Sequence, residues 1–282
     1  MTDTPEYVLP AGTPAKDIVK VLREYGVAII PSYFSEDKLK KLIKEHEEII
    51  EEATNGKGIQ GVKITIYTEQ LQFSKLVRAV REDLDGNRFP ILTKEFASDL
   101  MKEIVEGYMG TPSTINDRIY LTWEVAEEKP ITKNHLDPKF SLKFAVYLQR
   151  TDEMSGAFSY APRSHIIGRD IFYQYFRRYK TRKGAPCFPG DIPSDRYNEM
   201  VRDLVRLDGN AGDMIIFDDD GLHSGGLIHE GHDRKTIRAV SGIPWEAQPY
   251  RYTDPKAPPP EKYTLLGLWT YSKGVVKNLL AR

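Results

Sequence analysis

The sequence predicts a mainly β protein, an antiparallel barrel or jelly roll with flanking helices. From Arg118 onward, short strand-like segments alternate with turns, and no helices intervene at the regular intervals of a parallel α/β sheet. The chain has 282 residues, of which 40% are hydrophobic and 29% charged, enough to bury a full core without disulfides or structural metals. We therefore expect a single domain over residues 1–282.

The part before the barrel, residues 1–117, is expected to be mostly helical. Over 15–52, apolar positions at helical spacing are interrupted by a short apolar stretch, which predicts helix, strand, helix. Ser35 precedes acidic residues and is a suitable N-cap for the second helix. The segment 57–73 alternates after two glycines and predicts a strand near a site entrance, and 89–109 returns to helical spacing.

The jelly-roll core is expected over 118–245. Its predicted strands are "RIYLTWEVA", "SLKFAVYLQ", "GAFSYAP", "VRLDG", "DMIIFDD" and "KTIRAVSGIPW". An insertion at about 169–204 is too long for a plain loop, and such insertions often act as lids. Residues 246–282 are expected to form a C-terminal extension with a proline-rich connector and a short helix.

Charge and cysteine content exclude several classes of function. The 40 basic and 41 acidic residues leave a net charge of -1, so no overall field attracts nucleic acid or anionic lipid. No apolar run approaches the roughly 20 residues that a bilayer span requires, and the N-terminus lacks a signal pattern. The single cysteine, Cys187, agrees with a reducing compartment and leaves histidine and oxygen as the only metal ligands. We expect a cytoplasmic protein without nucleic-acid or membrane partners.

The stretch "NHLDP" places His135 and Asp137 two residues apart. On a strand, such residues point to the same face while Leu136 points away, so both can bind one ion. Taken alone, the pair is better explained by a surface turn that ends in proline. A third candidate ligand, His223, follows the apolar strand and acidic turn of "GDMIIFDDDGLHSGG", 88 residues later. Two histidines and one carboxylate form the facial triad of non-haem Fe(II) oxygenases, which leaves metal positions open for substrates.

Two arginines follow His223 on the last predicted strand. Arg234 lies eleven residues beyond the histidine, where a guanidinium can bind a carboxylate bidentately, and Arg238 lies on the same strand face. The alternative is that both are exposed charges of an edge strand. For Arg238 the two interpretations stay even.

With these residues in place, the chain resembles the phytanoyl-CoA hydroxylase-like family of Fe(II)/2-oxoglutarate-dependent dioxygenases. The similarity covers 17–52 and 118–245, and it rests on "YGVAIIPSYFSEDKLKKL", "NHLDP", "SGAFSYAPRSHIIG", "GNAGDMIIFDDDGLHSGG" and "RKTIRAV". It implies a double-stranded β-helix, the cupin-like jelly roll. It also implies His135, Asp137 and His223 as the iron ligands. Arg234 would bind the distal carboxylate of 2-oxoglutarate. Ser224 would add a hydroxyl, although the family's serine often lies one residue later, at Gly225 here.

The resemblance further implies that Fe(II), 2-oxoglutarate and O2 hydroxylate an unactivated C–H of a small molecule in specialised metabolism, with release of succinate and CO2. Family members that transfer halide have alanine or glycine at the acidic ligand position, which Asp137 occupies here, so hydroxylation is favoured over halogenation. Desaturation, cyclisation or epoxidation at the same site stays open. So do a non-catalytic metal-binding jelly roll and a zinc hydrolase. In "PRSH", Arg163 stands where the family usually has glycine.

The remaining histidines are not expected to bind metal. His46 lies in a charged helix and is expected to be solvated, and His165 is expected in a turn or behind the ligands. His229 and His232 fall in a polar loop and are expected to be exposed.

Three further groups of residues are considered for cation or substrate binding. The acidic run 218–220 lacks the spacing of a calcium loop and is expected to shape the turn before His223. A basic, aromatic run over 175–183 is either a solvated lid face or a contact for an anionic substrate. The candidates for substrate contact are Tyr67, Tyr120, Trp123, Arg177 and Trp245.

Overall fold

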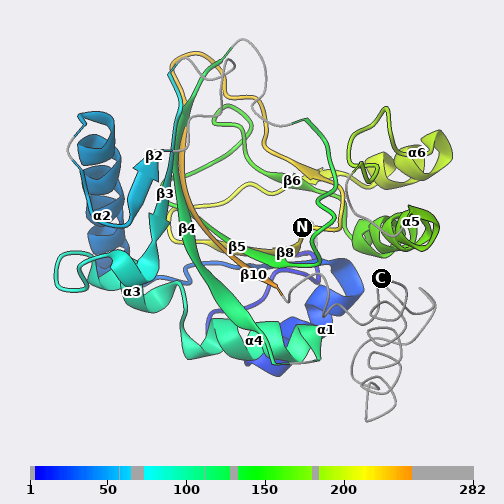
Figure 1. The fold of residues 1–282 in the computed structure, drawn as a ribbon, viewed down its shortest axis with the longest axis horizontal. Helices are drawn as coiled ribbons and strands as arrows, with labels where there is room; N and C mark the ends of the chain where they lie inside the picture. Colours follow the sequence, from blue (N-terminus) through cyan, green and yellow to red (C-terminus); the bar gives the residue numbers. More distant parts are fainter. Residues whose placement is uncertain are drawn as a thin grey trace, which may run out of the picture.

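Two antiparallel sheets face each other in the computed structural model, which describes residues 4–56, 58–64, 73–110, 112–127, 133–179 and 184–242 (Figure 1). The larger sheet has the strand order β1-β8-β5-β10-β4-β3-β2, and the smaller has the order β7-β6-β9. This arrangement confirms the predicted jelly roll. The strands are β1 (Val27–Ile30), β2 (Val62–Ile64), β3 (Lys75–Val80), β4 (Thr114–Val125), β5 (Leu142–Tyr147), β6 (Ser159–Tyr160), β7 (Val205–Arg206), β8 (Met214–Asp218), β9 (His223–Ser224) and β10 (Asp233–Gly242).

The two faces of the larger sheet have different partners, because successive side chains of a strand point to opposite sides. The outer face packs against the helices in the main apolar core, to which it contributes Ala28, Val77, Leu121, Phe144, Ile216 and Ile237 among others. The inner face looks toward the smaller sheet. Among the described residues, the inner face contributes to a second apolar cluster, which also contains Tyr160 and Leu207. The residues from the inner face are Val27, Ile29, Ala145, Tyr147, Ile215 and Phe217.

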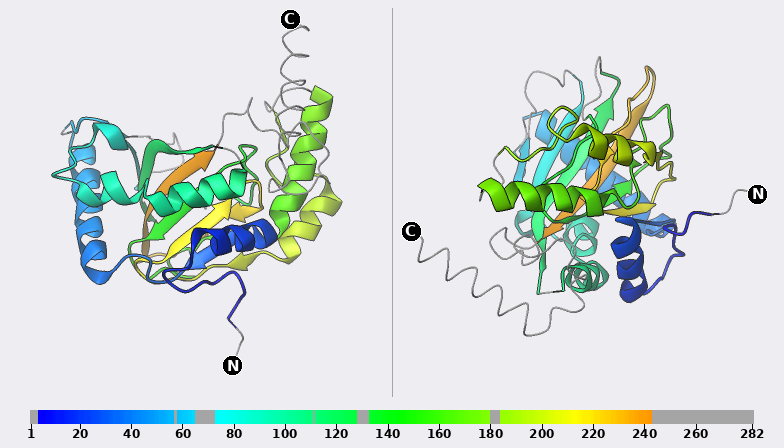
Figure 2. Two further views of the ribbon diagram at one scale, coloured as in Figure 1. Left: turned by 90° about the horizontal axis from the view of Figure 1, so that it is seen from below. Right: turned by 90° about the vertical axis from the view of Figure 1, so that its right-hand side faces the viewer.

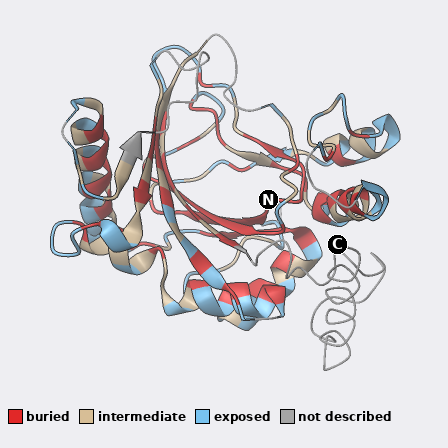
Figure 3. Ribbon diagram, in the orientation of Figure 1, coloured by how far each residue is buried: buried red, intermediate tan, exposed pale blue. Residues whose placement is uncertain are grey.

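The helices that precede β4 cover the outer face, and their buried sides turn toward the sheet (Figures 2 and 3). The predicted helix, strand, helix order of 15–52 is confirmed by α1 (Ala15–Tyr25), β1 and α2 (Glu36–Thr54). The predicted helical stretch 89–109 is divided into α3 (Pro90–Glu95) and α4 (Asp99–Met109), because Ser98 caps a new helix by accepting a hydrogen bond from the Met101 N–H.

The described part of the insertion contains two helices and begins earlier than predicted. Helix α5 (Ser164–Tyr179) starts directly after β6, and α6 (Ser194–Arg202) follows it; a short 3-10 helix, η1 (Arg81–Asp83), follows β3. Arg163 has φ 70, so the turn keeps the left-handed conformation for which glycine is best suited. Its guanidinium lies 4.8 Å from the centre of the Tyr25 ring and donates to Glu24, contacts that offset part of the backbone strain.

Among the described residues, no helix is both long and apolar enough to cross a membrane. The predicted C-terminal extension, 246–282, lies outside the described residues.

Candidate metal centre

The backbone brings His135 and His223 together from distant parts of the chain. His223 lies on β9, and His135 precedes β5 in an isolated antiparallel bridge to it. Each backbone N–H donates to the other residue's carbonyl, at 2.9 Å and 3.0 Å. Leu136, between the two predicted ligands, is fully buried in an apolar cluster with α5 and α6. The alternation expected from the sequence therefore holds, even though the segment is one bridge and not a full strand.

Both imidazole rings are oriented by backbone carbonyls. Nδ1 of His135 lies 2.8 Å from the Lys133 carbonyl oxygen, and Nδ1 of His223 lies 2.8 Å from that of Gly221. Because a carbonyl only accepts, each Nδ1 carries the proton and each Nε2 presents its lone pair. Burial lowers the pKa of His135 and lowers that of His223 well below its ordinary value. Two neutral imidazoles are the form in which histidine binds metal.

Asp137 completes a compact donor set. Its Oδ2 lies 4.0 Å from Nε2 of His223, and one ligand atom from each of the three residues lies within 4.8 Å of the others. Its backbone N–H donates to the Asp219 carbonyl at 2.8 Å, which fixes the residue against the turn before His223. Two imidazole nitrogens and one carboxylate, in reach of one point, are the donors that a facial-triad iron site uses. The residues therefore fit a divalent first-row metal.

The acidic run 218–220 builds the turn that leads to His223. All three side chains are fully buried. Asp218 accepts from the Tyr108 hydroxyl at 2.6 Å, and Asp219 accepts from the Ser141 backbone N–H at 3.0 Å. Burial, with the neighbouring carboxylates, raises the pKa of Asp219 to about 8. Although these three carboxylates are also close enough for a cation, their bonds to surrounding groups support the structural role expected from the sequence.

Lys143 is a site residue that sequence reasoning missed. It lies on β5 with its Nζ 2.5 Å from Oδ2 of Asp137 and 5.5 Å from the centre of the Phe217 ring, and it is only 9% exposed. Burial raises the pKa of Asp137, but the ammonium of Lys143 and the other nearby charges hold it well below its usual range. The available signal was a lysine inside the otherwise apolar strand "LKFAVY".

Arg234 is buried and already ion-paired. Its Nε donates to Oε2 of Glu124 at 2.8 Å, and its Nη1 donates to the Gly156 carbonyl. Gly156 also accepts from the N–H of Gly226, which follows β9, so Arg234 is connected by backbone contacts to the segment that begins at His223. Burial lowers the pKa of Arg234, but the charge of Glu124 outweighs it and the net shift is upward. Arg234 is therefore not the exposed edge charge of the alternative interpretation.

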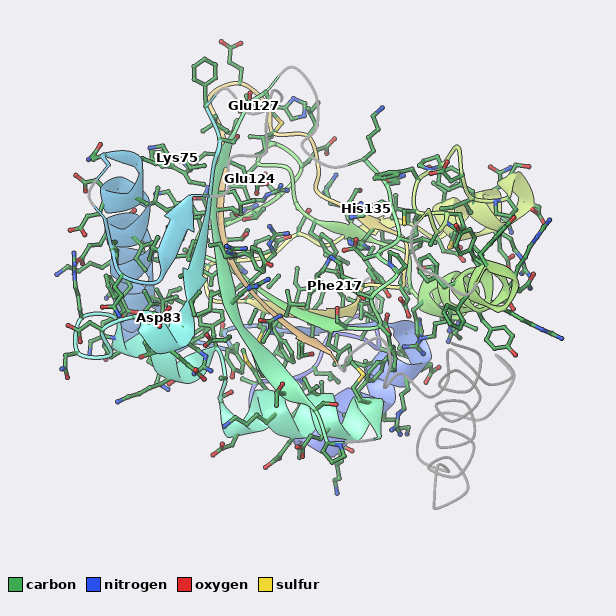
Figure 4. All side chains as sticks on the ribbon, in the orientation of Figure 1. Lys75, Asp83, Glu124, Glu127, His135 and Phe217 are labelled. Carbon is green, nitrogen blue, oxygen red and sulfur yellow. The ribbon has the colours of Figure 1, made fainter. Side chains whose placement is uncertain are left out.

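Glu124, His135 and Phe217 lie around the space between the two sheets, and Glu124 too was missed from the sequence (Figure 4). Ser224, 7% exposed, pairs with Ser159 across the smaller sheet. Phe188 is a further omission: its ring lies 6.1 Å from that of His135 and is 53% exposed. It offers an apolar surface directly beside the candidate ligands.

The other predicted contact residues fall in different places. Tyr120 and Arg238 occupy paired positions on the inner face of β4 and β10. Trp123 is on the outer face, where its Nε1 donates to Asp233 and the ammonium of Lys75 lies 4.5 Å from the ring centre, so the structure does not bring it to the metal ligands.

Arg177 is exposed in the last turn of α5. Tyr67 and Trp245 lie outside the described residues.

The prediction of a solvated His46 is wrong. Its side chain is 1% exposed, and its Nε2 lies 3.0 Å from the Thr122 carbonyl oxygen, because the charged helix α2 turns this position toward the sheet. His165 is fully buried, with Nε2 bonded to the Arg23 carbonyl oxygen. His229 and His232 are exposed, as predicted.

No protein-family model and no curated protein matches the chain. Solved structures share its fold. They include the non-heme alpha ketoglutarate dependent carbocyclase SnoK from nogalamycin biosynthesis, with a TM-score of 0.58 and 18% identity over 81% of this chain and 85% of that one. EctD from S. alaskensis with bound Fe has a TM-score of 0.59 and 12% identity over 83% and 79%. The epimerase SnoN, in complex with Fe3+, alpha ketoglutarate and nogalamycin RO, has a TM-score of 0.53 and 14% identity over 80% and 82%. At these identities the likeness establishes the jelly-roll fold.

Proposed function

We propose that this protein is a non-haem Fe(II)- and 2-oxoglutarate-dependent oxygenase that hydroxylates an unactivated C–H of a small molecule, within the phytanoyl-CoA hydroxylase-like family. The observation that carries the proposal is the donor set: two Nε2 lone pairs and one carboxylate within 4.8 Å of one another, inside a jelly roll. Structural neighbours with this fold include enzymes described as alpha ketoglutarate dependent and one with bound Fe.

The iron ligands in this proposal are His135, Asp137 and His223. When bound, Fe(II) with 2-oxoglutarate lets O2 oxidise the substrate: one oxygen atom enters succinate, the other enters the hydroxylated product, and CO2 leaves. The protein's part is to hold both imidazoles in the Nδ1–H form and to keep Asp137 ionised. Phe188 and Phe217, near the rings of His135 and His223, would limit access of water.

Arg234 is proposed to bind the distal carboxylate of 2-oxoglutarate. Its bonds to Glu124 and Gly156 use two of the roughly five N–H donors of a guanidinium, which leaves donors for a carboxylate. Glu124 then acts as a positioning residue, because it fixes the plane of the guanidinium. Ser224 is proposed to add its hydroxyl.

Other outcomes at the same site are distinguished by their products. Desaturation, cyclisation or epoxidation would also release succinate, and the neighbours include a carbocyclase and an epimerase. A zinc hydrolase or a structural metal module would need neither 2-oxoglutarate nor O2. A donor set of three residues in the described part of the chain argues against a purely structural metal, because structural sites normally fill their coordination with protein ligands.

The test is the visible iron-to-ketoacid charge-transfer band. Metal-free protein is mixed with Fe(II) and 2-oxoglutarate without oxygen, as wild type and as the His135→Ala, Arg234→Gln and His232→Ala variants. We expect a band in wild type, none in His135→Ala, and at least about a tenfold higher half-saturating 2-oxoglutarate concentration in Arg234→Gln, because a charge-assisted hydrogen bond is lost. The exposed His232 is the matched control and should leave the band unchanged. A folded wild type without a band would exclude the proposed cosubstrate chemistry.

A further inference from the structure

Two arginines and a tyrosine form one row across the inner face of the larger sheet. Arg78 on β3 and Arg238 on β10 both pair with Tyr120 on β4, from opposite sides. Neighbouring strands lie about 4.8 Å apart, so the two arginine backbones are about 10 Å apart with Tyr120 between them. Arg238 is four residues from Arg234 and therefore on the same face, the one that looks toward the smaller sheet.

Neither arginine of this row forms an ion pair among the described residues. The Nε atoms of Arg78 and Arg238 are buried and make no hydrogen bond, and neither guanidinium has an ion pair. Two other cations of the same face differ: Arg234 is bonded to Glu124 at 2.8 Å, and Lys143 to Asp137 at 2.5 Å. Both residues are half-buried, and withdrawing part of a cation from water is unfavourable unless a counter-charge compensates it.

The charge balance of the site points the same way. On the inner face of the described strands, two cations are paired with carboxylates, Arg234 with Glu124 and Lys143 with Asp137, whereas Arg78 and Arg238 have no ion pair among the described side chains. Fe(II) and the 2-oxoglutarate dianion bring equal and opposite charges. Loading the site would therefore leave Arg78 and Arg238 without an ion-pair partner among the described residues. Glu124 is bonded directly to Arg234 and acts on Arg238 only through space.

We propose that Arg78 and Arg238, with Tyr120 between them, bind a carboxylate or phosphate group of the substrate, so that the enzyme acts on an anionic small molecule. Guanidinium groups suit this role because their planar N–H pairs match the oxygens of either anion, and the phenol adds one more donor. The word "substrate" rests on the proposed function; the anion site itself does not. With this assignment, Arg238 does not bind 2-oxoglutarate.

The first experiment measures anion binding to metal-free protein without 2-oxoglutarate. Inorganic phosphate and benzoate are titrated separately by calorimetry and by thermal melting, each against sodium chloride of equal ionic strength, with neutral benzamide as a further control. We expect at least one anion to bind wild type and to raise its melting temperature, and Arg78→Gln and Arg238→Gln each to weaken that binding at least tenfold. Binding of phosphate alone assigns a phosphorylated substrate, and binding of benzoate alone assigns a carboxylate.

The control is Arg150→Gln, the same chemical change at a side chain that is 79% exposed, and it should bind the anion as wild type does. Arg78→Gln and Arg238→Gln should melt no lower than wild type without anion, because each removes an unpaired charge. Absence of anion binding in wild type, or equal binding in all four proteins, would overturn the proposal.

A second readout separates this proposal from the function on which it builds. In the charge-transfer titration, Arg78→Gln and Arg238→Gln should need the same 2-oxoglutarate concentration as wild type, whereas Arg234→Gln should need more. A rise for Arg238→Gln comparable to that for Arg234→Gln would place Arg238 in the cosubstrate site and overturn the proposal. Anion binding through the two arginines without any band in wild type would refute the oxygenase and support the anion site.

Discussion

Nζ of Lys143 lies 2.5 Å from Oδ2 of Asp137, so an ammonium group occupies one side of the carboxylate that we propose as an iron ligand. The two side chains come from β5 and from the bridge that precedes it. Because ammonium and metal compete for the charge of one carboxylate, the pair affects both the stability of the metal-free protein and its metal affinity.

Replacing Lys143 with methionine should destabilise the metal-free protein and favour metal binding. Asp137 would lose its main counter-charge, which for a largely buried pair costs roughly 3 kcal/mol. A divalent ion would restore that charge without competing with an ammonium, so Mn(II) should raise the melting temperature of Lys143→Met more than that of wild type. Thermal melting with and without Mn(II) measures both effects.

The matched control for this prediction is Lys139→Met. Nζ of Lys139 is 3.7 Å from Oδ2 of Asp137, but the lysine side chain is 55% exposed. The free energy of unfolding should therefore change by less than about 0.5 kcal/mol. Equal Mn(II)-induced shifts in Lys143→Met and wild type would show that Lys143 does not oppose the metal.

Burial of His46 should make the protein sensitive to mild acid. Burial lowers its pKa from 6.5 to about 4, although the hydrogen bond to Thr122 acts in the opposite direction. The unfolded chain therefore takes up a proton as the pH falls through 6.5, while the folded protein does so only near 4. The free energy of unfolding should fall across this window by roughly 2–3 kcal/mol for this residue and level off below it.

The variant His46→Gln keeps an N–H donor for the Thr122 carbonyl but does not titrate. Its free energy of unfolding, from urea titrations at pH 7.0, 5.5 and 4.5 (roughly spanning the window), should therefore decline less than that of wild type. His232→Gln, at an exposed position, should follow the wild-type curve. Parallel curves for His46→Gln and wild type would assign the acid sensitivity to other groups.

Gly168 should tolerate no side chain. A Cβ at this position of α5 would lie 1.9 Å from the Asp220 carbonyl oxygen, a backbone atom of the turn that leads to His223. Gly168→Ala should therefore destabilise the fold by about 3 kcal/mol and weaken Mn(II) binding, because the turn must move. Gly190→Ala, with open space around the new Cβ, should stay within about 0.5 kcal/mol of wild type. If Gly168→Ala is destabilised but binds Mn(II) as tightly as wild type, the position of this turn does not control metal binding.

The hydroxyl of Tyr108 should contribute to the same turn from the side of α4. It donates to Oδ2 of the fully buried Asp218 at 2.6 Å. Tyr108→Phe keeps the ring but leaves that oxygen with fewer donors, so we expect a loss of about 1–3 kcal/mol in chemical denaturation. Tyr179→Phe, at a ring that is 51% exposed, should have no measurable effect. A loss below about 0.5 kcal/mol for Tyr108→Phe would mean that Arg169, which also donates to Asp218, suffices.

Local patterns predicted much of the fold correctly. The order of α1, β1 and α2 follows from apolar spacing, and the strands after residue 118 follow from short alternating segments between turns. The division between α3 and α4 was missed, because a single cap at Ser98 interrupts an otherwise continuous pattern. His46 was misplaced for a similar reason: the charge of neighbouring helix residues does not tell which face of the helix meets the sheet.

By itself, the sequence determined the jelly-roll class and the three residues most suited to one metal, because strand alternation and the i, i+2 spacing of His135 and Asp137 are local properties of the chain. Only the tertiary structure decided which charges face one another. Lys143 pairs with Asp137 and Arg234 pairs with Glu124, whereas Arg78 and Arg238 form no ion pair among the described residues. These relationships depend on strand register and on the pairing of β3, β4 and β10, which long-range packing sets.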